Sequence, residues 1–154
     1  MKLTENFTLV EMTKSEAALR NNLDNTPTQS EVVNLKILCE KVLQPIRNHY
    51  GKGVKVNSGF RSKKVNTVIG GSKTSDHCNG QAADIEIPGL PNAELAEWIK
   101  ANLVYTQLIL EFYTPGVPDS GWVHVSYIQG NLKKQDLTAI KQNGKTVYLP
   151  GLKA

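Results

Sequence analysis

Cysteine and histidine are both scarce in this chain, which has two cysteines and three histidines among 154 residues. Two cysteines cannot build the disulfide framework of a small secreted domain, and no disulfide is expected in a cytoplasmic chain. Cys39 falls on the apolar stripe of a predicted helix and is expected to be a buried thiol. Cys78 adjoins His77, and because adjacent residues rarely coordinate the same ion, we do not expect it to bind metal.

Long apolar runs, a secretory signal and basic clusters interleaved with aromatic residues are also missing. No stretch approaches the roughly 18 continuous apolar residues of a membrane span. Residues 1–6 lack an apolar core and a cleavage site, so the chain is expected to be cytoplasmic as synthesised, without a signal peptide. The scattered basic residues argue against nucleic-acid binding. A net charge of +4 and a pI near 9.0 favour either an anionic partner, such as a bacterial wall, or simply a solvated surface.

The apolar periodicity predicts a single α+β domain over residues 1–154, with residues 1–29 as a leader segment that packs on it. A long amphipathic helix is expected over residues 30–48, with Pro45 kinking its last turn. Asn92 is expected to cap a second long helix, and residues 131–140 to form a polar segment ending in a helix. Strands are expected at residues 54–58, 83–87, 107–113, 122–127 and 146–150, with the third and fourth paired as a hairpin.

The segment Ser75–Asp84 carries the first chemical signal. His77 offers an imidazole nitrogen and Asp84 a carboxylate seven residues later, and Gly80 allows a tight turn between them. Asp84 enters an alternating strand, and His124 lies in a second alternating run. A lone histidine in a strand is more often structural than a ligand, so these residues gain weight only together. His49 instead follows the long helix near its end, where a histidine interacts favourably with the helix dipole.

Arg61 follows the predicted strand at residues 54–58, at a place where rigid elements often present a functional side chain. Its guanidinium could hold a substrate carboxylate or polarise a peptide carbonyl. It could equally form a salt bridge that fixes the loop. The residues alone leave these two roles open.

Several motifs together resemble the M15 metallopeptidases, the D-alanyl-D-alanine carboxypeptidase-like zinc peptidases that include bacterial cell-wall carboxypeptidases and phage endolysins. The resemblance covers roughly residues 7–152 and implies a small antiparallel sheet with flanking helices, the Hedgehog/D-Ala-D-Ala peptidase-like fold. By position it implies one zinc ion bound by His77, Asp84 and His124. The motifs are Ser58-Gly59-Phe60-Arg61-Ser62, Asn66, Gly70-Gly71-Ser72, Ser75-x-His77-x-x-Gly80-x-Ala82-x-Asp84 and Trp122-Val123-His124-Val125-Ser126.

The resemblance also assigns roles around the zinc site. It favours Arg61 as a catalytic residue that binds the substrate and stabilises the transition state. Ser75 is expected to hydrogen-bond the metal loop and orient His77. The further residues expected to bind substrate or to support the ligands are Gln107, Asp119, Trp122 and Ser126.

The general base is where this sequence departs from the commoner family pattern. Many members have an acidic residue three positions before the last histidine, but position 121 is glycine here. Glu111 is our candidate, because it ends the strand expected to pair with the His124 strand and shares its parity with Gln107. Asp119 on the connecting loop is the second candidate and Glu86 the third.

Together with these residues, the resemblance implies a monomeric zinc hydrolase that cleaves a peptide bond in bacterial peptidoglycan stem peptides. Three protein ligands leave a fourth zinc position for water, which distinguishes a catalytic site from a structural one. D-Ala-D-Ala carboxypeptidase and L-Ala-D-Glu endopeptidase activities both stay open. The enzyme would act on the wall if released, as a phage endolysin does. The alternative is a catalytically inactive zinc-containing module that binds the wall or has a structural role, and Gly121 is the feature that keeps this alternative open.

Overall fold

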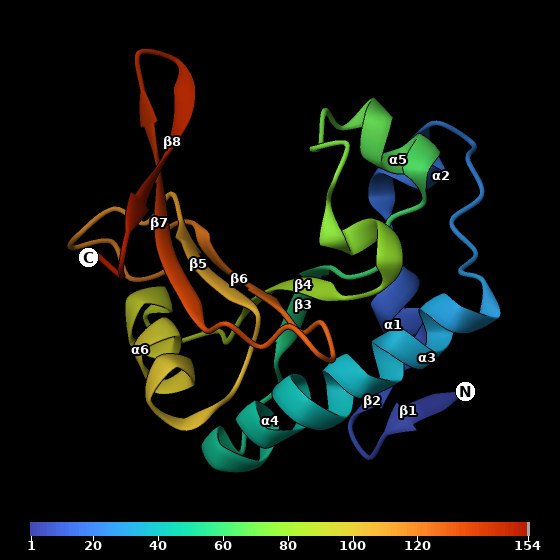
Figure 1. Cartoon of the computed structure of the whole chain (residues 1–154), viewed down its shortest axis with the longest axis horizontal. Helices are drawn as coiled ribbons and strands as arrows, with labels where there is room; N and C mark the ends of the chain where they lie inside the picture. Colours follow the sequence, from blue (N-terminus) through green and yellow to red (C-terminus); the bar gives the residue numbers. More distant parts are fainter. Residues whose placement is uncertain (154) are drawn as a thin grey trace.

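The computed structural model describes residues 1–153 and contains a six-stranded mixed sheet whose two faces differ sharply. One face packs against the helices. The other is open, between α5 and α2 on one side and a projecting β7–β8 hairpin on the other (Figure 1). The strands are, in spatial order, β3 (Lys55–Ser58), β4 (Ala82–Glu86), β6 (Trp122–Ser126), β5 (Gln107–Glu111), β7 (Gln135–Gln142) and β8 (Lys145–Pro150).

Strand parity separates the core from the open face. Alternate residues of β4, β5 and β6 point into the helical layer, and these side chains are almost fully buried, as a half-covered sheet requires. They are Ala83, Ile85, Leu108, Leu110, Val123 and Val125. The hairpin predicted from the third and fourth expected strands is confirmed as the antiparallel pair β5–β6.

The α+β class is confirmed, and a small antiparallel sheet of two strands is present near the N-terminus, but the larger sheet is mixed rather than antiparallel. β7 runs parallel to β5, from the pair Gln107–Gln135 to the pair Glu111–Ala139. The helix expected at the end of residues 131–140 is also wrong, because this segment enters β7. The polar composition of this segment did not indicate that its two central residues are buried. Thr138 and Ala139 lie between neighbouring strands on both sides. Pairing on both edges therefore overrides a weak local helical signal.

The long helix expected over residues 30–48 is present but is not continuous. It consists of α3 (Gln29–Leu38), a π-helical turn η1 (Cys39–Leu43) and α4 (Gln44–Tyr50). Pro45 lies in the first turn of α4, so it does not kink the last turn as expected. Because proline has no N–H to donate, the chain widens just before it, and the Gln44 N–H bonds to the Cys39 carbonyl five residues back.

The first 29 residues pack against the rest of the chain. They form β1 (Lys2–Thr4), β2 (Phe7–Thr8), α1 (Leu9–Thr13) and α2 (Glu16–Arg20). Phe7 and Met12 are buried in the main core, and the Met12 carbonyl accepts a 2.8 Å hydrogen bond from the Phe60 N–H. A Cβ on Gly59 would lie 2.4 Å from that carbonyl. The N-terminal segment therefore braces the loop that precedes Arg61, and α2 packs on α5 (Lys63–Val68) beside it.

Asn92 connects two parts of the chain rather than capping a helix. The N-cap of α6 (Asn92–Asn102) is Pro91, so the expected capping role of Asn92 is wrong. Its side chain is buried, and its amide donates to the Ser120 carbonyl at 2.9 Å and to the Gly121 carbonyl at 3.2 Å. It also contacts Glu86 Oε1 at 3.3 Å. The amide thus fixes the turn that enters β6, two residues before the strand reaches its histidine.

Both cysteines are free and buried, in agreement with the expectation for Cys39. Burial, together with the nearby charges of Glu11 and Glu40, raises the pKa of Cys39 to about 12, so the thiol is unreactive. Within residues 1–153, none of the helices has the length and apolar character needed to cross a membrane.

Replacing Asn92 with alanine is expected to lower the free energy of unfolding by about 1–3 kcal/mol, because it leaves two partly buried carbonyl groups without this donor. Asn102→Ala is the matched control, since its amide donates to a single carbonyl at the exposed end of the same helix. That control should change stability by no more than about 0.5 kcal/mol. Urea unfolding of both variants measures the difference, and equal losses would contradict the role assigned to Asn92.

Candidate metal centre and active site

The register of the central strands gathers polar side chains on the open face of the sheet. Asp84 on β4 is directly opposite His124 on β6, and Ile109 on β5 lies opposite His124 from the other side. Residues directly opposite in antiparallel strands point to the same face. Glu111 is opposite Trp122 two pairs further along, so its side chain reaches the same face.

His77 reaches this face from a short 3₁₀ helix, η2 (Asp76–Asn79), that precedes β4. Ser75 caps it, its hydroxyl accepting from the His77 N–H at 3.3 Å. Gly80 ends it at φ 72°, and a Cβ there would lie 2.6 Å from the Glu31 carbonyl, so the turn requires glycine. His77 Nδ1 lies 2.7 Å from the Gly59 carbonyl, which can only accept. Nδ1 therefore carries a proton, and Nε2 is the ring nitrogen that faces Asp84 and could bind a metal ion.

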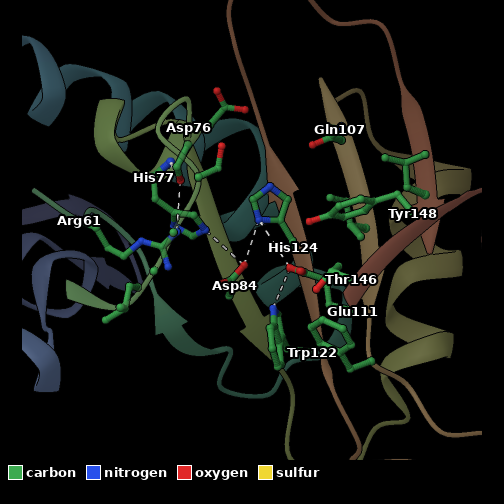
Figure 2. A pocket seen from close by; sticks show the side chains of 18 of the residues that line it. Arg61, Asp76, His77, Asp84, Gln107, Glu111, Trp122, His124, Thr146 and Tyr148 are labelled. Atoms are coloured by element: carbon green, nitrogen blue, oxygen red, sulfur yellow. Dashed lines mark hydrogen bonds and ion pairs between the residues drawn. The ribbon is translucent and has the colours of Figure 1, made fainter. Parts of the chain in front are cut away.

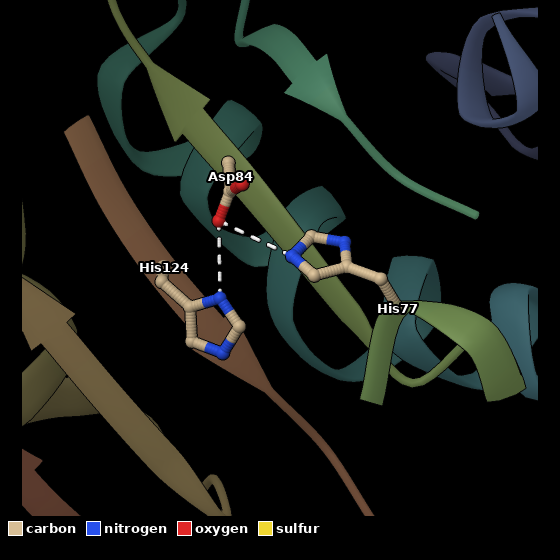
Figure 3. Close-up of side chains that lie close together, drawn as sticks. All are labelled: His77, Asp84 and His124. Carbon is tan, nitrogen blue, oxygen red and sulfur yellow. Dashed lines mark hydrogen bonds and ion pairs between the residues drawn. The ribbon is translucent and has the colours of Figure 1, made fainter. Parts of the chain in front are cut away.

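His77, Asp84 and His124 converge on one point (Figure 3). His77 Nε2 lies 3.4 Å and His124 Nδ1 lies 3.0 Å from the same oxygen, Asp84 Oδ1, and the three ligand atoms fall within 4.8 Å of one another. Ligand atoms at roughly 2.1 Å from a tetrahedral zinc ion lie about 3.4 Å apart. Two imidazole nitrogens and one carboxylate oxygen, spaced in this way and nearly buried, could hold a divalent metal ion.

The electrostatics of these three residues are tightly linked. Burial alone would raise the pKa of Asp84, but the facing imidazoles of His77 and His124 outweigh it and hold that pKa well below its ordinary range. Burial would lower the pKa of His124, but the hydrogen bond and charge of Asp84 raise it instead, and Glu111 adds to the effect. The carboxylate of Asp84 is therefore kept ionised, as a metal ligand must be.

Glu111 stands next to this cluster. Its Oε2 lies 4.0 Å from His124 Nδ1 and accepts a 2.9 Å hydrogen bond from the indole N–H of Trp122. Burial and the Asp84 charge raise the pKa of Glu111, with His124, Trp122 and Arg61 acting in the opposite direction. A carboxylate with a raised pKa, held by one donor and with its second oxygen free, can both take and return a proton.

Arg61 approaches from the other side. Its backbone N–H donates to the His77 carbonyl at 3.1 Å, and its guanidinium donates to Ser75 Oγ at 3.2 Å. Its buried Nε has no partner, and no ion pair joins Arg61 to another residue in the part of the chain that the structure describes. Burial lowers the pKa of Arg61, while Asp84, Cys78 and Glu111 oppose the change. A partly desolvated cation with a free donor suits an anionic or carbonyl group of a ligand better than it suits a structural salt bridge.

These side chains line a cavity of about 560 Å³ (Figure 2). Of the residues expected around the ligands, Ser75, Gln107 and Trp122 line it. Ser126 is fully buried and does not, and its hydroxyl has no hydrogen-bond partner among residues 1–153. Asp119 is exposed on the loop between β5 and β6 and lies outside the cavity lining. Cys78 is not part of the metal-binding cluster.

Other lining residues were not expected from the sequence. Asp76 lies beside His77, and Thr146 and Tyr148 come from β8 (Figure 2). Lys141 comes from β7. The sequence did indicate that Thr146 and Tyr148 point to the same side of the expected edge strand, because they are two residues apart. It did not indicate whether that side is the core face or the open face of the sheet. Only the parallel placement of β7 beside β5 brings these side chains to the metal-binding face.

An α+β fold with a His–Asp–His cluster and a neighbouring carboxylate in one cavity has the arrangement of a metal-dependent hydrolase. A protein-family model described as Peptidase M15 matches residues 5–126. The chain belongs to the M15 peptidase family, whose members are metallopeptidases. The match includes all three residues of the cluster and Glu111, whereas β7 and β8 lie beyond it. No curated protein matches the chain.

The missing acidic residue at position 121 has a steric explanation. Gly121 has φ 65°, and a Cβ there would lie 2.0 Å from the Glu111 carbonyl oxygen and 2.7 Å from the Phe112 carbonyl carbon. Phe112 itself has φ 55°, so the chain turns sharply on both sides of this contact. No side chain fits at position 121 in this backbone, and an acid at this end of the strand pair can come only from another residue.

Gly121→Ala is expected to be more destabilising than Gly116→Ala. Both glycines have positive φ, but a Cβ on Gly116 meets no atom within 4 Å. Alanine at position 116 should therefore lower the free energy of unfolding by about 1–2 kcal/mol, the cost of a left-handed backbone conformation. At position 121 the steric clash should add about 1–3 kcal/mol to that loss. Thermal unfolding of the two variants separates these contributions. Equal melting temperatures would show that the Glu111 carbonyl moves aside freely.

Proposed function

We propose that this protein is a zinc-dependent peptidase that cleaves a peptide bond in the stem peptides of bacterial peptidoglycan. The observation that carries the proposal is the position of Glu111, whose Oε2 lies 4.0 Å from His124 Nδ1 on the face that also holds His77 and Asp84. A metal site alone would serve binding as well as catalysis. A partly buried carboxylate with a raised pKa beside it favours hydrolysis.

Each side chain then has a defined part in the reaction. His77, Asp84 and His124 hold the zinc ion, which when bound supplies Lewis acidity toward water and the scissile carbonyl. Glu111 accepts a proton from the attacking water and returns it to the leaving amine, and the Trp122 indole keeps one of its oxygens in place. Arg61 binds the carbonyl or carboxylate of the peptide through its unpaired donors. The bond cut is that of a D-Ala-D-Ala carboxypeptidase or of an L-Ala-D-Glu endopeptidase, and the products distinguish them.

The alternative, an inactive zinc-containing module that binds the wall, depended on the absence of an acid at position 121. Glu111 supplies a carboxylate at the same end of the β5–β6 pair, where the Gly121 backbone passes directly against the Glu111 carbonyl. This removes the reason for preferring the alternative. Of the two other candidate bases, Asp119 lies outside the cavity lining, and Glu86 contacts the amides of Asn57 and Asn92 instead.

Glu111→Gln is expected to lower kcat for stem-peptide cleavage by about 10²–10⁴-fold, because the amide keeps the shape but cannot accept the proton. Zinc-loaded protein is incubated with peptidoglycan and the fragments are identified by mass spectrometry. Asp119→Asn is the matched control and should retain cleavage. Loss of cleavage in Asp119→Asn but not in Glu111→Gln would move the base to Asp119. Zinc binding without cleavage of any wall type by the wild type would favour the binding module.

Zinc is expected to bind at one ion per chain and to raise the melting temperature, since it binds only the folded arrangement of the three ligands. At a free zinc concentration of about 100 Kd the gain is about 2.7 kcal/mol. A chelator should reverse this gain, and His124→Ala should abolish it. His49→Gln is the control, because His49 stacks on Trp98 away from the cluster. In His49→Gln, zinc should still raise the melting temperature, even if the variant is less stable without zinc. If zinc raised the melting temperature of neither His49→Gln nor His124→Ala, the assigned ligands would be contradicted.

A further inference from the structure

The β7–β8 hairpin forms the wall of the cavity that faces Arg61. Figure 2 shows Arg61 and His77 on one side of the site and Thr146 and Tyr148 on the other. Both strands lie beyond residue 126, where the match to the family model ends. This wall is therefore a feature of the present chain outside the segment that defines its family, and it lies in direct reach of whatever the site binds.

The strand register determines which hairpin residues face the site. Ala139 lies beside Glu111 across the parallel β5–β7 pair, and it is opposite Tyr148. Lys141, two residues further along β7, shares that face and is opposite Thr146. The Lys141 ammonium donates to Thr146 Oγ1 at 3.2 Å. An ammonium, a hydroxyl and a phenol therefore stand together on the wall, and all three line the cavity.

Aromatic contacts connect Lys141 to the proposed base. Its ammonium lies 5.4 Å from the centroid of the Phe112 ring. Phe112 packs edge-on against Trp122 with ring centroids 5.4 Å apart, and Trp122 donates to Glu111. Contacts of this kind restrict a lysine that would otherwise sample many rotamers. Although Lys141 is exposed, these contacts favour a position of its ammonium on the cavity side of the hairpin.

The balance of charge around the cavity leaves this ammonium available. The lining contains three carboxylates, Asp76, Asp84 and Glu111, and two cations, Arg61 and Lys141. A divalent metal ion would formally offset Asp84 and Glu111, leaving two cations against Asp76. In residues 1–153 no carboxylate forms an ion pair with Lys141. The hairpin wall is accordingly complementary to an anionic group.

We propose that Lys141, together with Thr146 and Tyr148, binds a carboxylate of the peptide substrate on the side of the scissile bond opposite to Arg61. The ammonium pairs with the carboxylate, and the two hydroxyl groups can donate hydrogen bonds to it. This inference rests on the proposed peptidase function and adds a substrate class to it. The preferred substrate is a peptide with a free carboxylate near the cleaved bond, in addition to any carboxylate held by Arg61, and the amidated form of that peptide is a poor one.

The test uses pairs of synthetic stem peptides that differ in one carboxylate at a time, free in one member and amidated in the other. The zinc-loaded wild type should show a kcat/KM about tenfold higher for the free form of one pair. Lys141→Met should remove this preference by lowering kcat/KM for the free form alone, and Lys141→Arg should keep it. Lys145→Met removes the same charge from the far end of the hairpin, outside the cavity lining, and should behave as wild type.

The outcomes separate this inference from the proposed function. Equal cleavage of both members of every pair by the wild type, or an equal loss on both in Lys141→Met, would overturn the role of Lys141 while leaving the peptidase intact. If the wild type cleaves none of the peptides, calorimetric titration of the same pairs decides. Tighter binding of a free form that disappears in Lys141→Met supports the carboxylate site even though the peptidase proposal fails. Binding that does not depend on the carboxylate overturns it.

Discussion

Asp84 is the residue on which the arrangement of the site depends. Its carboxylate is nearly buried on β4, and a buried charge costs several kcal/mol unless it is paired. His77 and His124 provide that pairing through one shared oxygen, Oδ1. Each histidine comes from a different part of the chain, so the carboxylate is stable only when η2, β4 and β6 are all in place. The same three groups, once brought together, have the chemistry and spacing of a metal site.

The two faces of the main sheet have different roles in holding this cluster. Residues of one parity in β4, β5 and β6 are apolar and seal the helical core, while residues of the other parity carry the polar groups. The backbone behind His77 is held from a second direction. The Gly59 carbonyl that fixes the imidazole belongs to a loop braced by Met12, so the N-terminal segment contributes to the orientation of a side chain on η2. Rigid packing on both sides is what gives a three-residue cluster a defined geometry.

The two walls of the cavity differ in origin. The wall with Arg61, Ser75 and His77 lies within the segment matched by the family model, and the hairpin wall lies beyond it. In the proposed peptidase, the matched segment would supply the metal-binding cluster and the base, and the hairpin would contribute only to the choice of substrate. Loops and edge strands can change without disturbing the core, because few buried contacts depend on them.

The sequence by itself was sufficient to predict the α+β class and the β5–β6 hairpin, because alternation along a strand is short-range information. It also marked His77 and Asp84 as neighbours across one tight turn, but His124, forty residues further on, was added to them only through the family resemblance. Glu111 could be singled out because it ends the strand expected to pair with the His124 strand and has the same parity as Gln107. The tertiary structure alone decided that residues 135–142 form a strand parallel to β5, that Asn92 joins α6 to the turn before β6, and that Gly121 has no room for a side chain. It also decided that Lys141 and Tyr148 face the metal cluster. These features arise from contacts between segments far apart in the chain, where pairing energy and backbone clashes outweigh the local preferences that a sequence pattern records.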